Sequence, residues 1–219
     1  DPEMEEAWNY GLNLTQYFDV YGKELALNID YYRTDFVNQM IIDRDFSARE
    51  VLIYNLDGKS FSNSYQVEAQ YELIERLDVT AAFRYNDVRM TIDENLMRQP
   101  FVNRYKGLVT LSYATNLSKW QFDFTSQFNG DSRIPSTNDN PVDYQMKTSS
   151  PAYTILNAQI TRNFKKWEIY LGGENLTNYR QEDPIIASDD PFGKYFDSSM
   201  IWGPVSGIKI YAGFRFAIN

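Results

Sequence analysis

Two residue types are missing from this 219-residue chain, which contains neither cysteine nor histidine. Without cysteine there is no disulfide framework, no cysteine nucleophile and no thiolate zinc site. Without histidine, a Ser-His-Asp triad and the usual proton shuttle near neutral pH are excluded. No run of about 18 apolar residues predicts a transmembrane helix, and we expect no signal peptide before Asp1. We therefore expect no enzyme, no metal site and no other cofactor.

The charge balance and the aromatic content form an unusual pair. The chain has 21 basic and 30 acidic residues, a net charge of −9, which argues against a nucleic-acid partner because phosphate binding needs a basic surface. It also has 17 Tyr, 14 Phe and 4 Trp, although its mean hydropathy is only −0.51. The aromatic residues are spread along the chain, with polar residues between them.

The dominant period of the hydrophobic pattern is two. In the first segment Trp8, Tyr10 and Leu12 alternate with Asn9, Gly11 and Asn13. Strict alternation of this kind predicts half-buried antiparallel strands. Nine segments show it: 8–18, 24–32, 64–73, 77–86, 105–113, 120–129, 156–161, 167–172 and 208–216. No segment has the pattern of a convincing amphipathic helix.

Strand length separates this pattern from that of an ordinary soluble sheet. Several segments alternate for roughly ten residues, whereas strands of soluble sheets average about five to six. Ten residues tilted by about 45° cross the hydrocarbon core of an outer membrane. Aromatic residues stand at both ends of several apolar faces, as in the pairs Trp8 with Phe18 and Trp120 with Phe128. Such pairs are typical of the aromatic girdles of membrane barrels.

The connections alternate strictly in length. Short turns are expected at 20–23, 75–76, 116–119 and 164–166, and long polar loops at 38–60, 91–103, 130–151 and 176–204. Membrane barrels sort their connections in this way, with short periplasmic turns and long extracellular loops. We therefore predict an all-β fold, an antiparallel up-and-down transmembrane β-barrel.

The number of strands predicts that the barrel is incomplete. A bacterial single-chain barrel has an even number of strands and both ends in the periplasm. Nine strands that end in the periplasm start outside, and an open edge cannot face lipid because its backbone groups would lack partners. We expect residues 1–219 to be the C-terminal part of a larger barrel.

The segment Gly172–Tyr179 carries a resemblance to a known family. Its sequence, GGENLTNY, is similar to the G-x-E-N-L-x-N signature that opens the last extracellular loop of TonB-dependent outer-membrane receptors. The stretches 180–186, 190–193, 196–197 and 201–204 resemble the Bacteroidetes branch of that family, and 207–216 resembles its closing strand. The resemblance is specific over about 170–217 and only generic, as barrel strands, before that.

This resemblance implies a 22-stranded barrel that encloses an N-terminal plug, and the plug is absent from residues 1–219. It implies energised uptake of a scarce nutrient across the outer membrane of a Gram-negative bacterium. The nutrient would be an iron–siderophore complex first, otherwise haem, cobalamin or an oligosaccharide. The implied partners are the rest of the barrel and its plug, the inner-membrane TonB complex, outer-membrane lipid and the small nutrient ligand.

Four residues of the long loops are candidates for ligand contact: Arg44, Arg133, Arg180 and Trp202. Arginine offers a bidentate fork to anions, and loops commonly carry recognition, although ordinary loop residues are the commoner case. Two acidic clusters, 182–183 and 189–190, could bind a hard cation, but solvated loop charges are more frequent. Asn175 and Asn178 are expected to bond to the backbone at a strand end.

Charged residues also occur on the polar faces of the predicted strands. They are Asp30, Glu68, Glu72, Asp78, Arg84, Lys106, Asp123, Glu168, Lys209 and Arg215. In a small soluble core they would be costly to bury. In a wide barrel they line water or contact a plug, which we favour. The alternatives are a soluble β-barrel or β-sandwich that binds a small ligand and, disfavoured by the missing histidine, an outer-membrane phospholipase or protease.

Overall fold

A single long antiparallel sheet dominates the computed structural model, which describes residues 3–217. Nine strands follow one another in sequence order across this sheet, and a tenth short strand lies outside that path. The nine are β1 (Glu6–Val20), β2 (Lys23–Asn38), β5 (Ser60–Ile74), β6 (Leu77–Ile92), β8 (Tyr105–Ala114), β9 (Trp120–Asn129), β10 (Tyr153–Asn163), β11 (Trp167–Glu174) and β12 (Lys209–Phe216). Each corresponds to one of the nine predicted strands, and the all-β up-and-down topology is confirmed.

Two of the segments predicted as loops contain further strands, and this corrects the sequence analysis. Between β2 and β5 the chain forms a separate hairpin of β3 (Met40–Ser47) and β4 (Glu50–Asn55). After β6 the short strand β7 (Asn95–Arg98) folds back on it. These pairs are local, so the alternation of short and long connections is unchanged. Two single-turn 3₁₀ helices, η1 (Asn116–Ser118) and η2 (Val142–Tyr144), complete the elements, and within residues 3–217 no helix meets the length and hydropathy of a membrane span.

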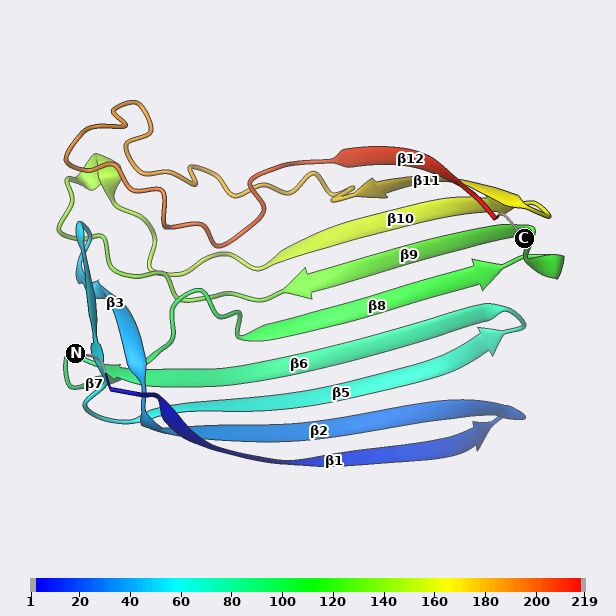
Figure 1. Cartoon of the computed structure of the whole chain (residues 1–219), viewed down its shortest axis with the longest axis horizontal. Coiled ribbons are helices and arrows are strands. Elements are labelled where there is room, and N and C mark those ends of the chain that lie inside the picture. Colours follow the sequence, from blue (N-terminus) through cyan, green and yellow to red (C-terminus); the bar gives the residue numbers. More distant parts are fainter. Residues whose placement is uncertain (1–2, 218–219) are drawn as a thin grey trace.

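The connections lie on opposite ends of the sheet according to their length. The four short turns gather at the end where β12 finishes, and the long loops gather at the end where β1 begins (Figure 1). The first turn is tight because Tyr21 and Gly22 both have positive φ, 55° and 75°, as a two-residue type I′ hairpin requires. The sheet therefore begins at the loop end with β1 and finishes at the turn end with β12, as the predicted odd number of strands demands.

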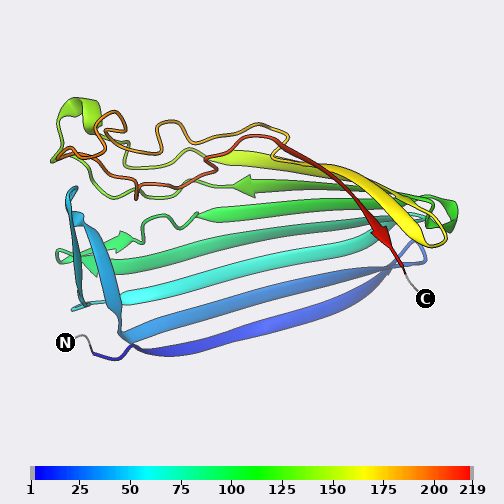
Figure 2. The same cartoon turned by 45° about the horizontal axis from the view of Figure 1, so that its top comes forward.

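The sheet is twisted and curved, and its two edges do not meet (Figure 2). Within residues 3–217, strand β1 pairs only with β2, and β12 pairs only with β11. Each edge strand therefore presents a row of backbone groups that no described strand satisfies. Because open edges are avoided in native sheets, the two edges indicate that further strands complete the barrel.

One face of the sheet is apolar across its whole width. Leu14, Ile29, Val67 and Phe83 stand directly opposite one another on β1, β2, β5 and β6. Their side chains are at least 40% exposed, and nothing in the described residues covers them. A contiguous exposed apolar surface of this size needs a partner, and lipid is one. A soluble β-sandwich would cover this face with a second sheet.

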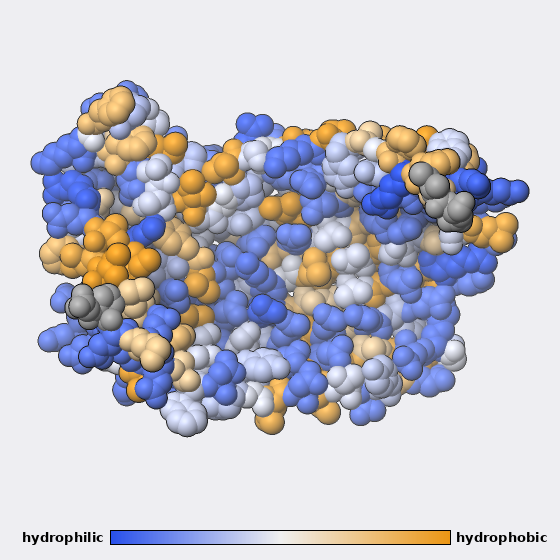
Figure 3. All heavy atoms as spheres, in the orientation of Figure 1, coloured by the Kyte–Doolittle hydropathy of each residue, from blue (hydrophilic) through white to orange (hydrophobic). Residues whose placement is uncertain are grey.

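The opposite face is polar. A row directly across the sheet consists of Asp30, Gln66, Arg84 and Lys106. Along this row Arg84 donates to Gln66 Oε1, and towards the turns Ser112 donates to Asp123 at 2.7 Å. The view in Figure 3 shows largely hydrophilic residues over the middle of the sheet. All ten charged residues predicted for one face lie on this polar face.

The buried hydrophobic residues gather at the loop end. One cluster consists of Ile41, Met90 and Ile92 at the base of the β3–β4 hairpin. The other consists of Ile134, Ile186, Ala187 and Met200, in the two longest loops. The loops therefore have a small hydrophobic core of their own, which gives them a defined shape. That shape positions the candidate site.

Candidate functional site in the long loops

The candidate site lies between the two longest loops, 130–152 and 175–208. Each loop folds back on itself through an isolated antiparallel bridge, Arg133 with Ser149 and Ile186 with Asp197. The second bridge is reciprocal, with N···O distances of 2.9 and 3.1 Å. The partly buried side chains of Tyr144, Met146 and Trp202 pack against the shared core of the two loops.

Gln181 holds together the two arms of loop 175–208, namely the outgoing arm before Ile186 and the returning arm after Asp197. Its side chain is only 4% exposed. Its Nε2 donates to the Met200 carbonyl at 2.9 Å, while its Oε1 accepts from the backbone N–H groups of Trp202 at 2.8 Å and Gly203 at 3.1 Å. Because all of these backbone groups lie in the returning arm, Gln181 fixes where Trp202 stands.

Asn175 fixes the turn by which the chain leaves β11. It is buried and has a φ of 51°, a conformation that asparagine tolerates better than most residues. Its Nδ2 donates to the carbonyls of Tyr179 and Ser206 at 2.8 and 3.0 Å, and its Oδ1 accepts from the Tyr179 N–H at 3.1 Å. The predicted structural role of Asn175 is confirmed: the first Asn of the GGENLTNY segment shapes the loop through bonds to its backbone.

Three aromatic rings lie together at the mouth of this loop. Tyr153, the first residue of β10, stacks on Tyr179 with ring centroids 4.6 Å apart and planes only 7° from parallel. Trp202 leans on both, at 6.1 and 6.4 Å. Burial raises the pKa of Tyr179, and the nearby Tyr153 and Glu182 add to this rise. Tyr179 is therefore a neutral hydrogen-bonding phenol at physiological pH.

A cavity of about 570 Å³ opens between the two loops. Its apolar and aromatic wall includes Tyr144, Ile185 and Trp202. Its charged lining consists of Lys147, Arg180, Asp143, Glu182, Asp183 and Asp189. A volume of this size fits a small molecule, and an apolar wall with a few polar groups is the usual composition of such sites. Carboxylates outnumber cations here, so the cavity suits a ligand that offers hydrogen-bond donors or positive charge besides an aromatic surface.

The structure brings two of the four predicted contact residues together. Arg180 and Trp202 both line the cavity. Arg180 is exposed, and its one side-chain hydrogen bond within the described residues is a long one, 3.4 Å, to Asn178 Oδ1. Its guanidinium therefore retains donors for a ligand.

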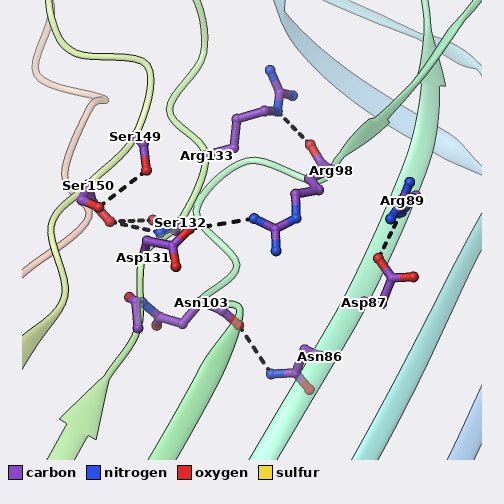
Figure 4. A network of polar contacts seen from close by, with 11 residues as sticks. Asn86, Asp87, Arg89, Arg98, Asn103, Asp131, Ser132, Arg133, Ser149 and Ser150 are labelled. Carbon is purple, nitrogen blue, oxygen red and sulfur yellow. Dashed lines mark hydrogen bonds and ion pairs between the residues drawn. The ribbon is translucent and has the colours of Figure 1, made fainter.

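Arg133 lies outside the cavity lining, in a network of polar contacts (Figure 4). Its Nη1 and Nη2 bind the two carboxylate oxygens of Asp45 at 2.6 and 2.8 Å, and its Nε donates to the Arg98 carbonyl at 2.5 Å. The side chains of Arg133 and Asp45 are 18% and 9% exposed. This bidentate pair joins the β3–β4 hairpin to loop 130–152.

Arg44 also lies outside the cavity lining. Its Nη1 donates to the Ser199 carbonyl at 3.0 Å, and its guanidinium stands 5.8 Å from the Phe101 ring centroid. It thus links the hairpin to loop 175–208. Of the two acidic pairs 182–183 and 189–190, Glu182, Asp183 and Asp189 line the cavity and Asp190 does not. Residues 3–217 contain no group of three or more acidic side chains close enough to hold a metal ion.

Sequence reasoning missed several residues of this site. Gln181 gave no signal because a single polar residue in a loop does not show that it is buried. Tyr144, Tyr153 and Tyr179 were visible as aromatic residues, but their convergence depends on how two distant loops fold. One usable signal was the density of Tyr and Trp in segments that were otherwise polar, since loops carry function and aromatic residues anchor ligands.

Comparisons with known proteins agree with the fold of the sheet. Residues 1–176 match the family described as "TonB dependent receptor-like, beta-barrel". This match covers mainly the strands that sequence reasoning described only as generic, and it overlaps the GGENLTNY segment at 172–176. No curated protein matches the chain.

Solved structures with the same fold include three iron receptors. The Pseudomonas aeruginosa receptor FpvA bound to a ferric pyoverdine has a TM-score of 0.65 and 16% identity, with 98% of this chain and 27% of that chain covered. The ferric enterobactin receptor PfeA of the same species has a TM-score of 0.66 and 15% identity, with 96% of this chain and 31% of that chain covered. The FrpB iron transporter from Neisseria meningitidis has a TM-score of 0.63 and 11% identity, with 98% of this chain and 31% of that chain covered. The chain therefore spans about a quarter to a third of the length of these proteins.

Proposed function

The chain belongs to the TonB-dependent receptor family, and from that premise we propose that it is the C-terminal part of an outer-membrane receptor barrel for energised nutrient uptake. The observation that carries the proposal is the match of 1–176 to the family, on a sheet with one apolar face and two unpaired edges. Members of this family are receptors rather than enzymes, in keeping with the absence of histidine and cysteine. The proposed location is the outer membrane of a Gram-negative bacterium.

In this proposal the apolar face contacts lipid and the polar face lines the lumen. A strand advances about 3.3 Å per residue, so ten residues tilted by about 45° span the roughly 25 Å apolar band of a barrel. Strands β1, β2, β5 and β6 have 15 or 16 residues, so they extend above the membrane at the loop end. The charged row from Asp30 to Lys106 would face water and the plug. A soluble ligand-binding barrel or sandwich is disfavoured because nothing in the described residues covers the apolar face.

We assign ligand capture to the cavity between loops 130–152 and 175–208. Trp202 and Tyr179 would offer aromatic surface, and Arg180 would offer free guanidinium donors. A ferric siderophore can present aromatic surface, N–H donors for the carboxylates and oxygen acceptors for Arg180, so we place an iron–siderophore complex first and keep haem, cobalamin and oligosaccharides as alternatives. Structures with this fold include receptors of ferric pyoverdine and ferric enterobactin and a copper transporter, which supports uptake of a metal-bearing nutrient.

The partners follow from the same proposal. The rest of the barrel would pair with the edges of β1 and β12, a plug would fill the lumen, and the inner-membrane TonB complex would supply energy. The similarity to the Bacteroidetes branch, and with it the exact set of nutrients, stays a prediction from 180–204.

The test is uptake by cells that express the parent receptor or its variants. A strain with the parent gene deleted is grown on defined iron, vitamin and glycan sources, and the source that requires the receptor identifies the nutrient. Arg180→Gln in the parent should then weaken nutrient binding by about tenfold, the value of one charge-assisted hydrogen bond. Phe192→Ala is the matched control, since Phe192 lies in the same loop, is fully exposed and does not line the cavity. A parent deletion without any growth defect would refute uptake, and equal binding by both variants would refute the assigned cavity.

A further inference from the structure

Arg162 lies on the apolar face of the sheet, which towards the loop end also carries Arg33 and Arg89. Arg162 stands directly opposite Trp120 on β9 and Ile169 on β11, in the row next to Phe122, Ile160 and Leu171. It is near the turn end of β10, and its guanidinium lies 4.7 Å from the Trp120 ring centroid and 5.3 Å from that of Phe164. Phe164 in turn stacks on Trp167 at 3.7 Å. Cation–π contacts of this kind hold the guanidinium in place but leave its N–H groups free.

The Arg162 guanidinium has no acceptor among the described residues. No side-chain hydrogen bond or ion pair of Arg162 is formed there, whereas Arg33, Arg89, Arg133 and Arg215 each pair with a carboxylate. The planar fork of five donors is suited to bidentate binding of a phosphate or carboxylate. Arg162 is therefore an unused anion-binding group at the edge of an apolar surface.

Three lysines share this edge. Lys119 lies in the turn between β8 and β9, and Lys165 and Lys166 form the turn between β10 and β11. The two turns are in contact, because Asn163 donates from its backbone N–H to the Lys119 carbonyl at 2.9 Å and from Nδ2 to the Ser118 carbonyl at 2.7 Å. The segments 113–122 and 162–167 contain no acidic residue, although acidic residues outnumber basic ones in the chain as a whole. This corner of the apolar face is thus locally positive.

An apolar hollow of about 600 Å³ lies in the same face, towards the middle of the strands. Ala158 and Gly173, two small residues directly opposite each other, stand in it beside the larger side chains of Phe122, Phe124, Ile160 and Leu171. Ile160 follows the hollow along β10, and Arg162 comes two residues later on the same face, about 7 Å further on. The hollow and the cation therefore form one continuous surface, apolar above and positive below.

We propose that this surface is a binding site for one anionic phospholipid. The phosphate would accept hydrogen bonds from Arg162, with Lys119, Lys165 and Lys166 adding positive potential, and one acyl chain would lie in the hollow over Ala158. Trp120, Phe164 and Trp167 are at the level where aromatic rings meet lipid headgroups. The proposal rests on the proposed function, because it takes the turn end as the periplasmic side and the lipid as one of the inner leaflet.

A phospholipid fits better than a protein partner. A protein segment could satisfy Arg162 with a carboxylate, but it would have to fill a hollow that lies at hydrocarbon depth in the proposed orientation. A phospholipid presents a negative headgroup and an apolar chain in the order and spacing that the surface shows. A free phosphate ion matches the cation but leaves the hollow unused.

The test uses the full-length receptor purified in detergent and analysed by native mass spectrometry. Phosphatidylglycerol, phosphatidylcholine and inorganic phosphate are each titrated against the wild type and three variants. Arg162→Gln removes the cation, and Ala158→Phe fills the hollow without altering charge. Arg76→Gln is the matched control, because Arg76 lies in another turn at the same end and pairs with Glu75 at 2.7 Å.

We expect one phosphatidylglycerol to remain bound more tightly than phosphatidylcholine. Its affinity should fall by at least about fivefold in Arg162→Gln and in Ala158→Phe, and remain unchanged in Arg76→Gln. Equal affinities for the two lipids, or an Arg162→Gln variant that binds like the wild type, would overturn the proposal. Binding of inorganic phosphate with the same affinity would also overturn it, in favour of a free anion.

Nutrient uptake by the same variants separates this proposal from the proposed function. Uptake that persists in Arg162→Gln while lipid binding is lost supports both. A wild-type receptor that binds the lipid but whose deletion alters growth on no nutrient would contradict uptake and leave the lipid site standing.

Discussion

Gln181→Ala tests whether the loop site is as ordered as the structure shows. Gln181 makes three hydrogen bonds to the backbone of the returning arm, to the Met200 carbonyl and from the N–H groups of Trp202 and Gly203. Since each hydrogen bond contributes about 1 kcal/mol net, and buried groups left unpaired cost more, the truncation should lower the local stability of this arm by about 3 kcal/mol. The global fold should be little affected, because the strands of the sheet do not depend on this contact.

Hydrogen–deuterium exchange of the receptor in detergent measures this loss directly. A decrease of about 3 kcal/mol corresponds to exchange roughly 150-fold faster at Trp202 and Gly203, if the arm opens as a unit. Gln145→Ala is the matched control: Gln145 also donates to two loop carbonyls, but its side chain is exposed and water can replace it. An increase in exchange rate below about threefold at Trp202, or equal changes in the two variants, would refute the role of Gln181 in holding the two arms of the loop together.

Three further perturbations test the rest of the structure. Asp45→Asn leaves the largely buried charge of Arg133 without its carboxylate, so it should destabilise the β3–β4 hairpin by about 2–4 kcal/mol. Faster proteolysis between residues 40 and 55 would show this loss. Glu75→Gln, which breaks an exposed ion pair, should have no measurable effect. Burial, together with the hydrogen bond from Tyr54 Oη to Asp43 Oδ2, raises the pKa of Tyr54 to about 12. The protonated phenol of Tyr54 therefore contributes fully to the stability of the fold below pH 10, and this contribution is lost as the pH rises through 12. An ultraviolet titration in which Tyr54→Phe does not remove the highest-pH tyrosine transition would contradict this. Gly11→Val would place a Cβ 2.4 Å from the Tyr31 carbonyl oxygen, which is a backbone atom and cannot move aside as a flexible side chain could. The variant should therefore fail to assemble in the outer membrane, and heat-modifiability on gels would show this failure.

The sheet could be predicted from the sequence because its pattern is local. Side chains of a strand alternate between the two faces, so Leu12, Leu14 and Phe18 identify an apolar face without any tertiary information. The sorting of the connections by length added the direction of each strand. Even the strand order followed, since an up-and-down sheet pairs each strand with the next.

The loop site could not be predicted because its contacts join distant segments. The carboxylate that pairs with Arg133 lies 88 residues away at Asp45, and the carbonyl that accepts from Arg44 lies 155 residues away at Ser199. A basic loop residue has the same appearance in sequence whether it binds a ligand or a carboxylate. The β3–β4 hairpin was missed for a related reason. Residues 38–60 were predicted as one polar loop, although Asp43 is buried and accepts from backbone N–H groups of its own strand.

Residue-by-residue accessibility along β5 tests the central claim most directly. Single cysteines are introduced at Gln66, Val67, Glu68 and Ala69 of a full-length receptor without other cysteines, and residues 1–219 already contain none. Each cysteine is labelled with a fluorescent probe in lipid vesicles. A barrel wall with a lipid face and a lumenal face predicts alternation: probes at 67 and 69 are quenched by brominated lipid, and probes at 66 and 68 by iodide in water. Absence of alternation, or quenching by brominated lipid at 66 and 68, would contradict the membrane orientation on which the proposed receptor depends.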